Sequence, residues 1–173
     1  AMKWTMNEAR YADTAWLFMA ASWYCRLRGY WHEDVDWLQA LLSHRQQFAP
    51  EMGLMLLINL ASRARSPQDF ERVSSYGDEL IALGERCNEK LLQSAVWHFL
   101  AKATDDFDLA ERYWQKAIGL LRKVSELSSP GGAWGVGTDR LFMLASTIDH
   151  YVIRLINRGE FAQAMPLIQE GLQ

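Results

Sequence analysis

The chain has 173 residues, of which half are apolar or aromatic and 23% are charged, a balance typical of a folded domain and not of a disordered segment. The formal net charge of −3 and the lack of any run of lysines and arginines argue against direct nucleic-acid binding. Cys25 and Cys87 form no CxxC pair, and no apolar stretch reaches the ~20 residues that a membrane span needs. We therefore expect one cytoplasmic domain over 1–173, with no cofactor, no metal and no membrane contact.

Helical spacing of apolar residues dominates the chain and predicts about eight helices. The first is expected from Asn7, a plausible N-cap, to a turn at Gly29, and the second over 33–46. Proline is favoured in the first turn of a helix, because its missing N–H would have no partner there. Pro50 and Pro67 therefore predict the starts of the third and fourth helices.

Asn88 is expected to cap the fifth helix, and Asp105 or Asp106 the sixth, because their side-chain oxygens accept bonds from free backbone N–H groups. A Gly-rich connection then follows at about 128–138. Glycine and proline in this segment disfavour a helix. The chain is thereby divided into six helices before the connection and two after it.

After the connection, a helix is expected over 138–157, followed by a turn at Gly159. The last helix contains Pro166, so we expect it to start late or to kink. An array that stops in this way is typical of a piece of a longer protein, and we expect this chain to be one.

A short signature occurs four times: an aromatic ring is followed three residues later by a short side chain, and then by apolar residues at helical spacing. The rings are Trp31, Phe70, Phe107 and Phe161, which lie 39, 37 and 54 residues apart. Repeats of this length indicate a stack of helical hairpins, each too small to bury its apolar face alone.

The segments 106–110 (Asp-Phe-Asp-Leu-Ala) and 158–164 (Arg-Gly-Glu-Phe-Ala-Gln-Ala) resemble the tetratricopeptide repeat. Asp34 departs from the family pattern, which has a small residue there. The resemblance covers nearly the whole chain. It implies an all-α, right-handed superhelix of about four tetratricopeptide-like hairpins that binds partners on its concave face.

The first hairpin, with Ala15-Trp16, residues 23–30, Trp37-Leu38 and Leu41-Leu42, resembles the opening repeat of bacterial multidomain signalling ATPases that regulate transcription. The chain has no GxxxxGK[ST] loop of its own. The resemblance therefore implies a sensor arm, attached in the parent protein to an ATPase or DNA-binding module.

Three cations occupy equivalent places, five residues before the ring of the first three hairpins: Arg26, Arg65 and Lys102. Equivalent places line up in stacked repeats, so we expect a basic edge along a groove. The groove itself is expected to include Trp16, Trp23, Phe99 and Asp149. Such a surface suits a protein or peptide that carries carboxylates, or a small effector. The other reading is that cations are favoured at helix C-termini by the helix dipole.

Trp134, in the Gly-rich connection, is interpreted either as a lid over a ligand or as an anchor that packs on the scaffold. His98 is expected to be a hydrogen-bonded interior residue. No catalytic set is recognisable in the sequence, so we expect a non-catalytic binding scaffold. The alternatives are a homo-oligomerisation module, such as a homodimer, and an enzyme with a site between helices.

Overall fold

The structure of the chain is a computed structural model that describes residues 1–124 and 140–172. These residues form ten α-helices, one 3-10 turn and no β-strand, so the all-α prediction is confirmed. No helix among them is both long and apolar enough to cross a bilayer. In chain order the elements are α1 (Met2–Asn7), α2 (Tyr11–Leu27), α3 (Trp31–Leu42), η1 (Arg45–Gln47), α4 (Pro50–Arg63), α5 (Pro67–Ser75), α6 (Gly77–Arg86), α7 (Lys90–Ala103), α8 (Phe107–Leu121), α9 (Arg140–Asn157) and α10 (Phe161–Gly171).

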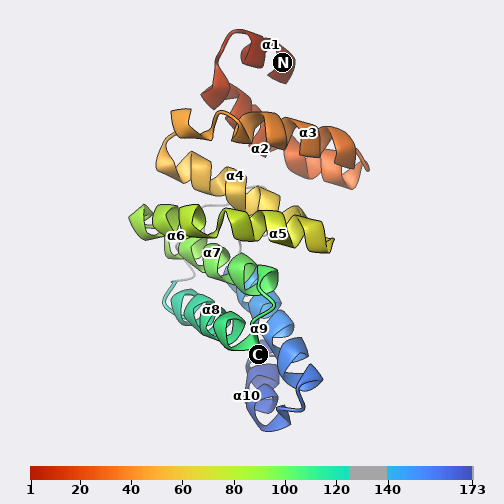
Figure 1. Cartoon of the computed structure of the whole chain (residues 1–173), viewed down its shortest axis with the longest axis vertical. Coiled ribbons are helices and arrows are strands. Elements are labelled where there is room, and N and C mark those ends of the chain that lie inside the picture. The colour runs from red at the N-terminus through yellow and green to blue at the C-terminus, as the bar shows by residue number, and fades with distance from the viewer. Residues whose placement is uncertain (125–139, 173) are drawn as a thin grey trace.

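The helices are stacked along one long axis in approximate chain order, with α1 and α10 at opposite ends (Figure 1). α2 pairs with α3, α7 with α8, and α9 with α10, while α4 packs against both α5 and α6. Successive units then touch through α3 and α4, through α4 and α7, and through α8 and α9. The arrangement is an open stack and not a bundle closed around a central axis; the right-handed superhelix stays a prediction.

The short residues of the repeated signature lie where helices approach closely. Val73, Ala110 and Ala164, each three residues after a ring, are all buried. The ring of Phe107 is covered by the guanidinium of Arg158, whose Cζ lies 4.0 Å from the ring centroid. The ring of Phe161, in the last hairpin, is 60% exposed. Phe107, inside the stack, is thus half-buried, whereas Phe161, at its end, is exposed.

Several predicted helix ends are confirmed by their local geometry. α4 and α5 begin at Pro50 and Pro67. The Ser66 hydroxyl accepts a bond from the Asp69 N–H at 3.2 Å, and Asp69 Oδ2 accepts one from the Ser66 N–H at 3.0 Å, which completes a capping box. Asp106 caps α8 by accepting a bond from the Leu109 N–H.

Gly29 and Gly159 end α2 and α9 in the left-handed region, with φ of 79° and 78°. Glycine adopts this conformation without the steric cost that other residues incur. The end of α9 at Asn157 is as predicted, and the helix is described from Arg140 onward.

The structure has two more helices than predicted, because two segments are divided. Asn7 ends α1 and does not cap the first long helix, since Ala9 has a φ of 54° and interrupts the path before α2. The fourth predicted helix divides at Tyr76. Glycine at position 77 is unfavourable inside a helix. The acidic Asp78 and Glu79 stabilise the N-terminus of a new helix, because its dipole is positive there.

Three further boundaries were predicted wrongly. The second helix ends at Leu42, and η1 follows it. Asn88 does not cap α7, whose N-cap residue is Glu89, without a side-chain bond. Of the two outcomes predicted for the last helix, the late start is wrong, because α10 begins at Phe161 and continues through Pro166, and the kink stays a prediction. Packing of its apolar residues, including Ala164, into the core shared with α9 offsets the hydrogen bond lost at proline.

The core consists of two adjoining clusters of buried residues. The larger cluster extends from α2 to α9, and the smaller one joins α7, α8, α9 and α10. Tyr113 and Leu144 pack against both clusters. The two clusters therefore form a continuous interior, which fixes the faces of α4, α7 and α9 relative to one another.

Candidate binding face

Arg65, one of the three predicted edge cations, lies directly after α4. Its guanidinium donates hydrogen bonds to the carbonyl oxygens of Ser62 at 3.0 Å and of Ala64 at 2.9 Å. These carbonyls belong to the C-terminal turn of the helix, which has no internal partners for them. Arg65 therefore caps the C-terminus of α4. This agrees with the alternative interpretation of the sequence, in which cations are favoured at helix C-termini by the helix dipole.

Lys102 lies near the C-terminus of α7, close enough to Arg65 for the two charges to interact. Burial lowers the pKa of the Lys102 ammonium, and the positive charge of Arg65 lowers it further. The Lys102 nitrogen lies 5.7 Å from the centroid of the Phe99 ring. Within residues 1–124 and 140–172, neither cation forms an ion pair with a carboxylate. The Asp69 carboxylate lies beside Arg65, because its Oδ2 accepts a bond from the Arg65 backbone N–H at 3.1 Å, but it forms no ion pair with the guanidinium.

His98, one helical turn before Lys102 on α7, joins α7 to α9. Its side chain is only 3% exposed, and Nδ1 lies 3.0 Å from Thr147 Oγ1. The Thr147 hydroxyl donates to the Met143 carbonyl oxygen at 2.6 Å, so the imidazole N–H is the donor toward Thr147. The prediction of an interior, hydrogen-bonded His98 is confirmed.

The charge state of His98 follows from its surroundings. Burial, the neighbouring His150 and the Lys102 ammonium together lower the pKa of His98 to about 3. The ring of His150 meets that of His98 edge-on, with centroids 5.3 Å apart. The His150 Nδ1 lies 2.7 Å from the Ser146 carbonyl oxygen. His98 is therefore neutral at pH 7 and serves as packing and hydrogen-bonding structure near Lys102.

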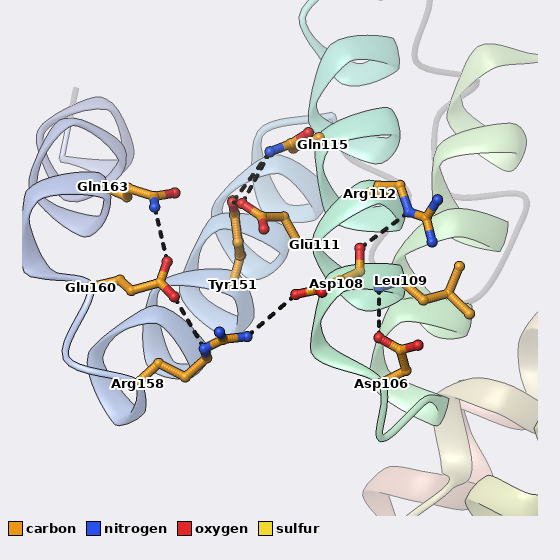
Figure 2. A network of polar contacts seen from close by, with 10 residues as sticks. All are labelled: Asp106, Asp108, Leu109, Glu111, Arg112, Gln115, Tyr151, Arg158, Glu160 and Gln163. Carbon is orange, nitrogen blue, oxygen red and sulfur yellow. Dashed lines mark hydrogen bonds and ion pairs between the residues drawn. The ribbon is translucent and has the colours of Figure 1, made fainter.

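A polar network holds α9 against α8 and α10 and so fixes its position beside α7 (Figure 2). The buried Tyr151 of α9 donates its hydroxyl to Glu111 of α8, which also accepts from the Gln115 amide at 3.2 Å. Burial and the bond to Glu111 raise the pKa of Tyr151 to about 12, so the phenol keeps its proton. Arg158 reaches Glu160 at 3.1 Å and Asp108 at 3.5 Å.

The remaining predicted site residues are not gathered at one place. Trp16 is 52% exposed, on α2 farther along the stack (Figure 1). Asp149 is exposed on α9, next to His150. Phe99 is a correction, because it is only 8% exposed and belongs to the core. Its burial in the core makes it a support for Lys102, whose nitrogen lies over its ring, and not an open groove wall.

Three predicted site residues lie wholly or partly outside the described part of the chain. The side chains of Trp23 and Arg26, and all of Trp134, lie outside the described part of the chain. The structure adds His150, which the repeat alignment did not indicate, because its approach to His98 depends on how α7 packs on α9. We call the surface made by Arg65, Lys102 and His150 the basic face.

No group of three or more potential metal ligands occurs in the part of the chain that the structure describes. The basic face consists of two cations whose side chains form no ion pair among the described residues and of the half-buried imidazole of His150. Comparisons with protein-family models, with curated proteins and with solved structures found no match.

Proposed function

We propose that this chain is a non-catalytic helical-repeat scaffold that binds an acidic segment of a protein or peptide on its basic face. The observation that carries the proposal is the pair of cations Arg65 and Lys102, whose charges act on each other and whose side chains form no ion pair with a carboxylate among the described residues. Bringing two like charges together has a cost, and an anionic ligand removes it.

The scaffold reading is supported by the order of the stack and by the buried short residues Val73, Ala110 and Ala164. These are features expected of tetratricopeptide-like hairpins, which present one helix of each pair to a common surface. A role as the sensor arm of a signalling ATPase is a narrower proposal, and it rests on the resemblance of the first hairpin alone.

Peptide selection tests the proposal. A random peptide library is selected on the wild-type chain, and the affinities of the enriched peptides are measured by fluorescence anisotropy. We expect enrichment of aspartate and glutamate, and an affinity loss of about tenfold when Arg65 and Lys102 are both replaced by alanine, since two charge-assisted contacts are removed.

The matched control replaces Arg86 and Lys90, which are also an exposed helix-end arginine and a lysine but lie outside the basic face. This control is expected to bind the selected peptides like the wild type. Equal affinity of the Arg65/Lys102 double variant and the wild type would contradict the proposal, and so would a selection that shows no preference for acidic residues.

A second candidate function, self-association, is favoured by the exposed apolar side of α10. Phe161, Met165 and Leu172 are 60%, 52% and 84% exposed, and their spacing places them along one side of the helix and its end. Light scattering after size exclusion tests this reading. A dimer mass that becomes a monomer mass in a Phe161→Ser/Met165→Ser variant supports it, and a monomeric wild type refutes it.

A further inference from the structure

A hollow of about 420 Å³ lies between α6, α7 and α8, apart from the residues of the basic face. Its apolar walls are formed by Ile81 of α6, by Val96 and Trp97 of α7, and by Leu120 of α8. The volume falls within the ~300–1,000 Å³ that small-molecule sites occupy, and a mostly apolar lining with a few polar groups is typical of such sites.

Gly119 is the reason that the hollow is open on the α8 side. It lies inside α8, where glycine is the least favourable residue after proline. A Cβ built at Gly119 would meet no described atom within 4 Å, whereas a Cβ at Gly84, on the facing wall, would lie 3.3 Å from a methyl group of Val96. Gly84 is therefore required for the close approach of α6 to α7. At Gly119, by contrast, a side chain would extend into open space.

The rim of the hollow carries an excess of positive charge. The Lys116 nitrogen lies 4.2 Å from the centroid of the Trp97 ring, so a cation–π contact holds the ammonium at the rim. Lys123 also lines the hollow, just after the end of α8, and Glu85 is the one acid among the lining residues. In the described part of the chain, neither lysine forms an ion pair.

We propose that this hollow binds a compact apolar molecule that carries a single anionic group, such as an aryl carboxylate. The apolar body lies against Val96, Trp97 and Leu120, and the carboxylate accepts hydrogen bonds from the ammonium groups of Lys116 and Lys123. Glu85 on the opposite wall disfavours a second negative charge. The inference uses none of the residues of the basic face, so it stands or falls apart from the proposed peptide function.

A set of probes that share one body and differ in charge tests the proposal. 1-Naphthylacetate, the neutral 1-naphthylacetamide and the cationic 1-naphthylmethylamine are titrated into the full chain. Binding is followed through the indole N–H resonance of Trp97, which is assigned with a Trp97→Phe variant. We expect the acetate to shift this resonance and to bind about threefold to tenfold more tightly than the amide, with the amine weakest.

Two variants separate the apolar part of the site from the charged part. Lys116→Ala/Lys123→Ala is expected to bind the acetate no better than the amide, and Gly119→Leu is expected to abolish binding of both by filling the hollow. Lys3→Ala, an exposed lysine at the far end of the stack, is the matched control and binds like the wild type.

Circular dichroism verifies that each variant keeps its helices. If Gly119→Leu fails to fold, the lysine variant and the three probes still decide the question. Equal affinities for acetate and amide, retained binding in a folded Gly119→Leu chain, or an unmoved Trp97 resonance at probe saturation would each overturn the proposal.

Discussion

His98 makes the stability of the chain depend on pH in a defined direction. The pKa of this imidazole is lowered from 6.5 to about 3 by burial, with His150 and Lys102 contributing. The unfolded chain therefore binds a proton at His98 near pH 6.5, while the folded chain does not. Stability attributable to the neutral ring is fully present above pH 6.5, decreases as the pH falls below that value, and is lost by about pH 3.

The size of the effect follows from the two pKa values. Taking the pH from 7 to 5 is expected to lower the free energy of unfolding by about 2 kcal/mol through this one group. The assay is urea unfolding at both pH values, followed by circular dichroism. In a His98→Asn variant, whose amide nitrogen can still donate to Thr147, the difference between pH 7 and pH 5 is expected to shrink by that amount.

His150 provides a control that acts on the same group. A His150→Gln variant removes one cause of the lowered pKa of His98, but burial, the largest cause, remains and keeps the folded-state pKa below 5. Its loss of stability between pH 7 and pH 5 through His98 is therefore expected to stay close to that of the wild type. An NMR titration of His98 offers a direct check, since its ring protons are expected to stay unshifted down to pH 5. A His98 that titrates near pH 6.5, or an unchanged pH dependence in His98→Asn, would refute the reasoning.

Three further substitutions test single contacts by urea unfolding. Tyr151→Phe removes the donor to Glu111 and is expected to cost about 1 kcal/mol, and an unchanged midpoint would contradict the role of the network in Figure 2. Ser66→Ala removes the acceptor for the Asp69 N–H and is expected to cost about 1 kcal/mol, unlike Ser66→Asn, which keeps a cap. Gly119→Ala is expected to raise stability by up to about 1 kcal/mol, and a loss would show that the α8 side of the hollow is filled.

Helix ends that depend on one or two neighbouring residues can be predicted from the sequence. Proline at Pro50 and Pro67, the Asp106 carboxylate and the left-handed Gly159 each act within a few residues, so their effect is readable from the chain alone. The division at Ala9 gives no such signal, because alanine favours helix, and its positive φ occurs where the chain turns α1 back against α2.

The candidate sites were predictable only in part, because each combines residues from several helices. The alignment of Arg65 with Lys102 came from repeat spacing, and the charge of Arg65 lowers the pKa of Lys102. The approach of His150 and the hollow at Trp97 depend on how α7 packs against α9, α6 and α8. For the hollow, the one local signal was Gly119, an unfavourable residue inside a helix.

Small-angle X-ray scattering of the chain tests the open stack most directly, since the basic face combines residues from successive units of that stack. A compact domain of 173 residues would have a radius of gyration of about 16 Å. We expect a clearly larger value for a sample shown to be monomeric by light scattering, with a distance distribution that has a long tail. A value near 16 Å with a symmetric distribution would contradict the open stack and, with it, the basic face.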